Sequence, residues 1–194
     1  MDDPDVALML AFSKGQEEAF VELYNRHRDR IVSYTRRMLG NQAQAEEAAQ
    51  DVFLKLYRAR ETYAPRSRFS TFLYRIATNH CLNLNARVER KLVRPDVEAA
   101  NRPAPERAAG TRQDAELERK RLRETLNTAL ASLPERQRAA LLLVHYEGMS
   151  YREAAGAIEV SESAIKSLIH RARSAMMREL EPELRNDRGV LHAV

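Results

Sequence analysis

The sequence predicts an all-α protein: two small helical domains joined by a flexible linker. The chain has 194 residues but only six glycines, and its aromatic residues are seven tyrosines and five phenylalanines. Such a composition favours helices over sheets. Apolar residues recur at helical spacing in both halves of the chain, and the periodicity is lost between them. We therefore expect one domain at residues 1–90, a linker at 91–114, a second domain at 115–185 and a tail at 186–194.

Composition also restricts the function. A single cysteine, Cys81, excludes an internal disulfide and a thiol cluster, so we expect a reducing, cytoplasmic setting. The acidic start, MDDPDVALMLAFSKG, differs from a secretory signal, and no apolar run is long enough to insert into a membrane. Because no phosphate-binding glycine loop, nucleophile elbow or zinc-binding histidine pair is present, we expect neither catalysis nor a metal or cofactor.

The first domain is expected to contain three long helices. The apolar stripe of the first runs from Phe20 to Met38, and Gly40 stops it. The second runs from Gln42 to about Arg60, and the proline-containing segment from Thr62 to Ser67 then breaks the pattern. The third is the stretch RFSTFLYRIATNHCLN, residues 68–83.

The second domain has clear helix boundaries. A helix stripe from Leu122 ends at SLPE, where we expect Ser132 and Glu135 to form a capping box around the next helix start. That next helix stops at Gly148, and a second capping box, Ser150 with Glu153, begins a short helix. A final long helix, capped by a serine at position 161 or 163, reaches about Leu180.

Residues 150–180 have the layout of a helix-turn-helix, in which the second helix enters the DNA major groove. The free face of that helix offers hydrogen-bonding groups near its start and cations further along, as base readout and phosphate anchoring require. Its candidate DNA-binding residues are Ser163, Lys166, Ser167, His170, Arg171 and Arg173. The alternative is an ordinary helical corner with a solvated basic face. Glu159 occupies a turn position where glycine is common, which predicts local backbone strain.

The second helix carries another stripe besides its core face. It comprises Glu47, Gln50, Asp51, Leu54, Lys55 and Arg58. Physical chemistry alone favours a solvated face with Asp51 and Lys55 as an intrahelical ion pair. An apolar Leu54 among charges is also compatible with protein docking.

The third helix separates into two faces. Phe69, Leu73 and Ile76 belong to the expected core stripe. The opposite face offers a ring for stacking on a base, amides for reading it and arginines for phosphates. Together with the preceding loop, the candidate residues on this side are Arg66, Arg68, Phe72, Arg75, Asn79 and Asn83. An equally weighted alternative is that Phe72 and Tyr74 belong to the core. We interpret the neighbouring His80 and Cys81 as structural.

Taken in order, the segments AEEAAQDVFLKLYRA, RFSTFLYRIATNHCLN, LPERQRAALLLVHYEGMSYREAAGAIEVS and SAIKSLIHRARSAM resemble a bacterial extracytoplasmic-function (ECF) sigma factor. The likeness extends from about Phe20 to Leu180. It implies a sigma region 2 bundle and a sigma region 4 helix-turn-helix, with core RNA polymerase (its β′ and β subunits), promoter DNA and an anti-sigma factor as partners. It further implies an alternative sigma factor that opens the minus-ten element and is not an enzyme.

The resemblance also implies a role for each candidate set. The stripe from Glu47 to Arg58 falls where the family docks the polymerase β′ coiled coil. The set from Arg66 to Asn83 falls where it opens the minus-ten element, and the set from Ser163 to Arg173 where it reads the minus-thirty-five element. Two residues depart from the family pattern: Phe72 replaces a common tryptophan, which reduces stacking area, and Leu168 replaces a common arginine, which removes one expected DNA contact.

Two rival functions fit parts of the sequence. One is a helix-turn-helix transcription regulator with an N-terminal sensory or dimerisation domain, and the other is a helical adaptor that binds only proteins. The regulator would have no need of the Arg66–Asn83 face. The adaptor would show no salt-dependent DNA binding.

Overall fold

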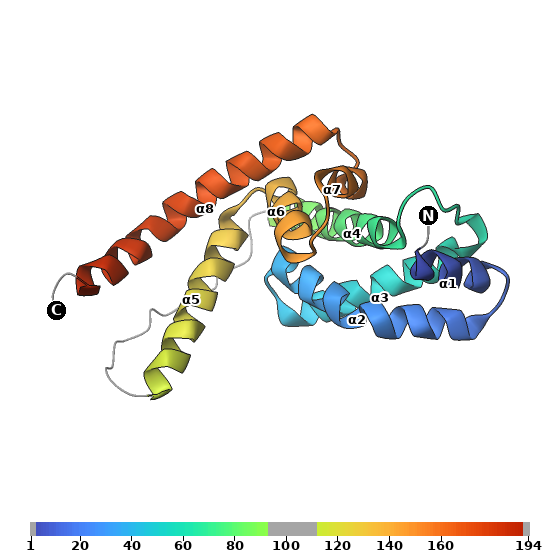
Figure 1. Ribbon diagram of the computed structural model, residues 1–194, viewed down its shortest axis with the longest axis horizontal. Coiled ribbons are helices and arrows are strands. Elements are labelled where there is room, and N and C mark those ends of the chain that lie inside the picture. The colour runs from blue at the N-terminus through green and yellow to red at the C-terminus, as the bar shows by residue number, and fades with distance from the viewer. Residues whose placement is uncertain (1–2, 93–111, 192–194) are drawn as a thin grey trace.

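A computed structural model describes residues 3–92 and 112–191, with side chains for residues 3–87, 121, 122 and 124–181. In this part of the chain all regular secondary structure is helical, as the sequence predicts (Figure 1). The elements in the N-terminal half are α1 (Pro4–Ser13), α2 (Glu17–Leu39), α3 (Gln42–Arg58), a 3₁₀ turn η1 (Ala59–Thr62) and α4 (Phe69–Leu92). Those in the C-terminal half are α5 (Arg112–Ser132), α6 (Glu135–Leu141), a π-helical turn η2 (Leu142–Tyr146), α7 (Tyr151–Ile158) and α8 (Glu162–Leu191).

The N-terminal half is a bundle in which α2 packs along α3, and α4 packs against both. Gly40 joins α2 to α3 with a φ of 71°, a left-handed conformation that glycine adopts without strain. The bundle core contains Leu23, Ile31, Leu56 and Leu73, all fully buried. This core fixes how the outer faces of α3 and α4 are presented to solvent.

Helix α1 was not predicted, although its start signal is present in the sequence. The Oδ1 of Asp3 accepts a hydrogen bond from the backbone N–H of Asp5 at 3.0 Å, and Pro4 occupies the first helical position. The Oδ2 of the same carboxylate accepts from the backbone N–H of Phe69 at 2.9 Å. Asp3 therefore caps both α1 and α4.

One of the two predicted capping boxes is confirmed. Ser150 accepts from the backbone N–H of Glu153, whose carboxylate accepts from the backbone N–H of Ser150. The box predicted at Ser132 and Glu135 is wrong. Ser132 is the last residue of α5 and donates to the carbonyl of Ala129, while Pro134 precedes the first turn of α6.

The turn between α7 and α8 has the expected strained position. Glu159 adopts φ 60° and ψ 50°, and is the only non-glycine residue with positive φ in the described part of the chain. Ser161 is the serine that caps α8, because its hydroxyl accepts from the backbone N–H of Ala164 at 3.2 Å. The helix-turn-helix layout predicted for residues 150–180 is present.

The two helices beside the predicted linker are longer than expected. Residues 91 and 92 continue α4, and residues 112–114 belong to α5, although the sequence assigned all of them to the linker at 91–114. Helix formers such as Lys91 and Arg112 continue each helix even without an apolar stripe. The rest of the predicted linker lies outside the described residues.

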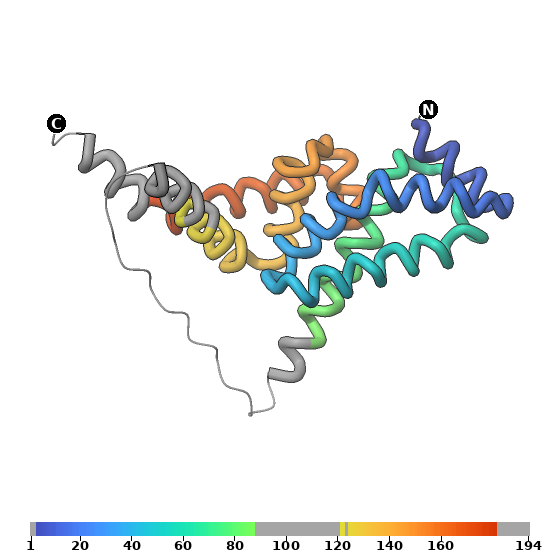
Figure 2. Tube along the Cα trace, turned by 90° about the horizontal axis from the view of Figure 1, so that it is seen from below, coloured from blue at the N-terminus to red at the C-terminus, as the bar shows by residue number. Residues whose placement is uncertain are grey.

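The two halves pack against each other. Helix α7 contacts α4, and α2 contacts α5 and α6 (Figures 1 and 2). The buried apolar side chains form one cluster that includes both halves. Buried Arg138 of α6 donates to the carbonyls of Met38 at 2.6 Å, of Leu133 at 3.0 Å and of Ala131. These are unpaired carbonyls near the C-terminal ends of α2 and α5, so one guanidinium satisfies helix ends in both halves.

Candidate functional site

The stripe predicted on α3 faces solvent. Glu47, Gln50, Leu54, Lys55 and Arg58 are exposed, and Asp51 is half-buried. Leu54 has 52% of its surface exposed, which is unusual for a leucine on a bundle whose other leucines are largely buried. The core face, with Ala49, Val52 and Leu56, lies on the opposite side of the helix.

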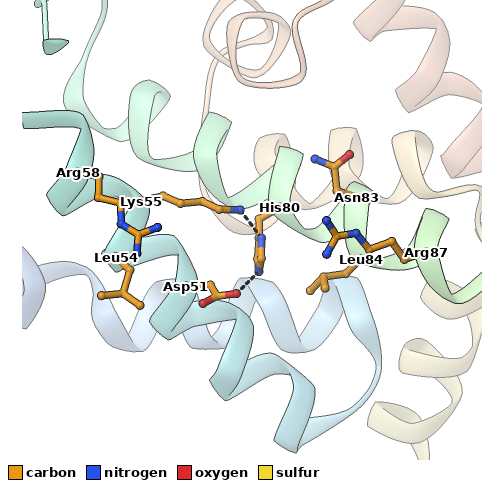
Figure 3. A pocket seen from close by; sticks show the side chains of 8 residues that line it. All are labelled: Asp51, Leu54, Lys55, Arg58, His80, Asn83, Leu84 and Arg87. Carbon is orange, nitrogen blue, oxygen red and sulfur yellow. Dashed lines mark hydrogen bonds and ion pairs between the residues drawn. The ribbon is translucent and has the colours of Figure 1, made fainter.

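A groove of about 280 Å³ runs between this stripe and α4 (Figure 3). It is lined by Asp51, Leu54, Lys55, Arg58, His80, Asn83, Leu84 and Arg87. Three cations and one carboxylate make the groove basic, and the two leucines give it an apolar edge. Leu84 and Arg87 therefore extend the α3 stripe, an extension that spacing along one helix could not reveal.

His80 lies in the middle of this groove, between Asp51 and Lys55. The Lys55 Nζ donates to Nδ1 of the ring, and Nε2 lies 3.3 Å from the Asp51 carboxylate (Figure 3). Because Nδ1 accepts, the ring proton of neutral His80 is on Nε2, which lies near Asp51 without forming a hydrogen bond to it. The intrahelical pair predicted between Asp51 and Lys55 is wrong, since His80 of α4 separates the two charges.

Burial, together with the Lys55 ammonium, lowers the pKa of His80 below its ordinary value of 6.5, although Asp51 opposes the shift. A histidine with a lowered pKa binds fewer protons folded than unfolded, so it favours folding above pH 6.5 and loses that contribution as pH falls. We expect the free energy of unfolding to decrease below about pH 6.5, and His80→Gln to flatten that decrease. Urea denaturation at a series of pH values measures the free energy of unfolding of the wild type and of the variant. An unchanged pH slope in the variant would exclude His80 as the titrating group.

The sequence left open whether Phe72 belongs to the core or to a DNA-facing surface, and its surroundings have features of both. Its ring is half-buried, packed edge-on against Tyr63 with 5.1 Å between centroids, and the Arg75 guanidinium lies 5.3 Å from its centroid. The phenylalanine thus borders the core and still has surface beside the loop that contains Arg66. Arg66 itself is exposed.

The remaining residues of this candidate face are divided between two surroundings. Arg68 and Asn79 contact the C-terminal half: the Arg68 Nε lies 3.3 Å from Glu153, and the Asn79 amide donates to Glu159 at 3.4 Å. Asn83 is exposed and lines the groove described above. The structure therefore does not bring all six residues together as one surface.

The candidate face on α8 is open to solvent. Ser163, Lys166, Ser167, His170, Arg171 and Arg173 are all exposed, whereas Ile165, Ile169 and Ala172 are buried on the other side. The Arg173 guanidinium lies 2.8 Å from Nε2 of His145 in η2. Burial and Arg173 lower the pKa of His145, so its neutral ring accepts this hydrogen bond. Helical periodicity could not predict this contact, because η2 and α8 are distant in the chain.

Comparison with known proteins accounts for both halves. The family model for sigma-70 region 2 matches residues 23–91, and that for sigma-70 region 4 matches residues 123–176. The RNA polymerase sigma-H factor of Pseudomonas aeruginosa is 31% identical over 94% of this chain and 97% of its own length. The chain is an ECF sigma factor. The ECF RNA polymerase sigma-E factor of Escherichia coli K12 is similarly related, with 29% identity over 93% of this chain and 96% of its own.

Two solved structures share the fold of this sigma factor. CnrH, solved in complex with the cytosolic domain of CnrY, has a TM-score of 0.69 and 24% identity, covering 93% of this chain and 99% of its own. The sigma factor RpoE of Bartonella quintana, solved with the anti-sigma factor NepR, has a TM-score of 0.64 and 20% identity, covering 84% and 96%. Both likenesses support the two-region helical architecture.

The family assignment decides between the functions considered from the sequence. An ECF sigma factor is an alternative sigma factor that directs RNA polymerase to promoters, and it is not an enzyme. Because region 2 and region 4 models both match, a regulator with an unrelated sensory domain is excluded. Among the described residues no helix is long and apolar enough to cross a membrane, and no three potential metal ligands are grouped.

Proposed function

We propose that this sigma factor divides its work as the sequence predicts, with residues 1–90 binding core polymerase and opening the minus-ten element and residues 115–185 reading the minus-thirty-five element. It would act in the cytoplasm. The observation that best supports this division is that each candidate set contains exposed side chains of the chemistry its partner requires. The α3 and α8 sets lie opposite the buried faces of their helices, whereas the minus-ten set is divided between the loop before α4 and α4 itself, where Phe72 borders the core.

The docking surface is the α3 stripe with the groove beside it. Exposed Leu54 supplies an apolar contact, and Lys55, Arg58 and Arg87 form a basic flank. Glu47 and Asp51 supply carboxylates on the same stripe. Mixed charge around a central apolar residue is typical of a specific protein interface with a polar rim.

To open the promoter, the protein must gain binding energy from contacts to the unpaired strand. Extruding and unstacking a base costs a few kcal/mol, which stacking and hydrogen bonds to the free base must offset. Phe72 with Arg75 above its ring supplies a stacking surface, and Asn79 supplies an amide for a base edge. Arg66 and Arg68 in the loop before α4, and Asn83 within α4, add contacts to the strand.

The α8 face binds duplex DNA. Lys166 and Ser167 lie near the start of the helix, where a recognition helix contacts base edges, and Arg171 and Arg173 follow for the phosphates. The salt dependence of duplex binding tests the phosphate contacts. Since the sigma factor of the NepR complex is bound by an anti-sigma factor, we also propose such a partner here, directed at the polymerase-facing surfaces.

The decisive test is transcription by purified core polymerase with and without this protein on a library of promoter sequences. We expect added protein to produce new, sequence-selective start sites. Absence of such sites would contradict the proposed function.

Phe72→Ala and Asn79→Ala are expected to slow promoter opening about tenfold or more, because each removes a proposed contact to the unpaired strand. Binding to core polymerase should remain within a factor of about two, since neither residue lies on the α3 stripe. Permanganate footprinting of open promoters measures the first effect and a pull-down the second. The matched control is Asn25→Ala at an exposed position of α2. Equal losses of opening and polymerase binding would mean that the two residues are structural.

A further inference from the structure

Three carboxylates of the C-terminal half contact the N-terminal half. The first, Glu147 after η2, has a side chain only 6% exposed. It accepts from the Tyr74 hydroxyl of α4 and from the Arg30 guanidinium of α2 at 3.1 and 3.2 Å. A carboxylate this deeply buried between two donors fixes the position of the second half against the first.

The other two carboxylates contact residues predicted to bind the promoter strand. Glu153 lies 3.3 Å from Arg68, and Glu159 accepts from the Asn79 amide at 3.4 Å. Arginine and asparagine are the groups that would otherwise face phosphate and base. In the described structure these carboxylate oxygens occupy the hydrogen-bonding positions that a nucleic acid strand requires.

Helix α7 also packs closely over the side of α4 that carries Asn79 and adjoins Arg68. A Cβ placed on Gly156 of α7 would lie 3.3 Å from Cγ2 of Thr71, one turn before Arg75. Thr71 is buried at this contact, and its hydroxyl has no hydrogen-bond partner among the described atoms. A DNA strand following Arg68, Thr71 and Asn79 would therefore overlap with α7.

We propose that the acidic surface formed by Glu147, Glu153 and Glu159 is an internal docking surface for the strand-opening side of α4, and competes there with the single-stranded minus-ten DNA. This inference rests on the proposed role of Arg68 and Asn79. The duplex-reading face of α8 stays open in the same arrangement, since Lys166, Ser167 and His170 are exposed to solvent. The free protein would thus bind the minus-thirty-five duplex but not the minus-ten strand.

The contacts are suited to release. Arg68 is two-thirds exposed and the Asn79–Glu159 bond is long, so water and salt weaken these two pairs. The unpartnered Thr71 hydroxyl also disfavours the closed arrangement. To expose the strand-opening side, docking to polymerase must separate α7 from α4 against the buried Glu147 contacts and the shared apolar cluster.

A steric variant tests the competition without changing charge. Gly156→Ala needs a shift of a few tenths of an ångström, whereas Gly156→Leu places a large side chain against Thr71 and should be compatible only with separated halves. Both substitutions favour the α7 helix itself, so alanine controls for helix propensity. We measure binding of a fluorescent single-stranded minus-ten oligonucleotide to the full chain without polymerase. We expect Gly156→Leu to bind about tenfold more tightly or better, Gly156→Ala to change little, and duplex minus-thirty-five binding to stay the same.

A charge variant tests the acidic surface independently. Glu147→Gln, Glu153→Gln and Glu159→Gln together preserve side-chain shape, and the amide oxygen introduced by Glu153→Gln can still accept in the α7 capping box. The matched control removes three exposed carboxylates, by Glu18→Gln, Glu124→Gln and Glu179→Gln, so both triple variants gain the same net charge. The variant of the acidic surface should bind the single strand more tightly than the control variant does.

The outcomes separate this inference from the proposed function. If Gly156→Leu and the acidic-surface variant bind the strand no better than their controls, while wild type still starts transcription with core polymerase, internal competition is wrong and the proposed function stands. If no variant supports selective initiation, the proposed function fails. Arg58→Cys and Ser174→Cys allow one label on each half, and the distance between the two labels gives a second readout. Gly156→Leu should lengthen the distance between the labels, and an unchanged distance would contradict separation of the halves.

Discussion

Leu54→Glu is expected to weaken binding to core polymerase by about 30-fold or more, because a carboxylate replaces the apolar centre of the docking stripe and loses its water in the complex. Leu54 is already 52% exposed in the free protein, so the bundle should fold normally. Titration of labelled polymerase with each variant measures the affinity, and thermal unfolding checks the fold.

Val21→Glu is the matched control for this change. Val21 is an apolar residue of α2 with 55% of its surface exposed, almost the same as Leu54, but it lies outside the stripe. Asp51→Lys should act like Leu54→Glu through charge reversal, although it also places a second cation beside His80. If Leu54→Glu and Val21→Glu bind polymerase equally well, the stripe is not the docking site.

Arg138→Met is expected to lower the free energy of unfolding by about 3 kcal/mol, since it leaves buried carbonyls at the ends of α2 and α5 without donors. Methionine retains much of the side-chain volume, so the loss reports the hydrogen bonds more than a cavity. Burial lowers the pKa of the Arg138 guanidinium below its ordinary value, the direction expected for a charge removed from water.

Arg136→Met controls for the loss of one positive charge on the same helix, because Arg136 is exposed. Its unfolding midpoint in urea should match that of the wild type, whereas that of Arg138→Met should be lower. Coincident midpoints for the two variants would show that the three carbonyls are satisfied without the guanidinium.

Features governed by local chemistry were predicted well from the sequence. Ser150 and Glu153 form their box because every group involved lies within one turn, and Gly40 ends α2 through its own backbone freedom. The same local reasoning failed at Ser132. A capping box would require its oxygen to accept from the backbone N–H of Glu135, whereas its hydroxyl donates to the carbonyl of Ala129 in the preceding turn.

Features that depend on a second helix could not be predicted in this way. The spacing of Asp51 and Lys55 indicates an ion pair on one helix, but His80 from α4 lies between them. Arg68 and Asn79 were identified as exposed polar residues, yet their carboxylate partners come from a part of the chain about 80 residues away. Periodicity says which face of a helix is polar, and not which distant segment covers it.

The double cap at Asp3 has a practical consequence for handling the protein. One carboxylate near the start of the chain anchors the first turn of α4, immediately after the loop that contains Arg66. Shortening the chain by three residues, or replacing Asp3 during cloning, would therefore fray a helix more than sixty residues downstream. A fusion tag placed before Met1 and left uncut keeps that carboxylate, so it is the safer choice for purification than a trimmed N-terminus.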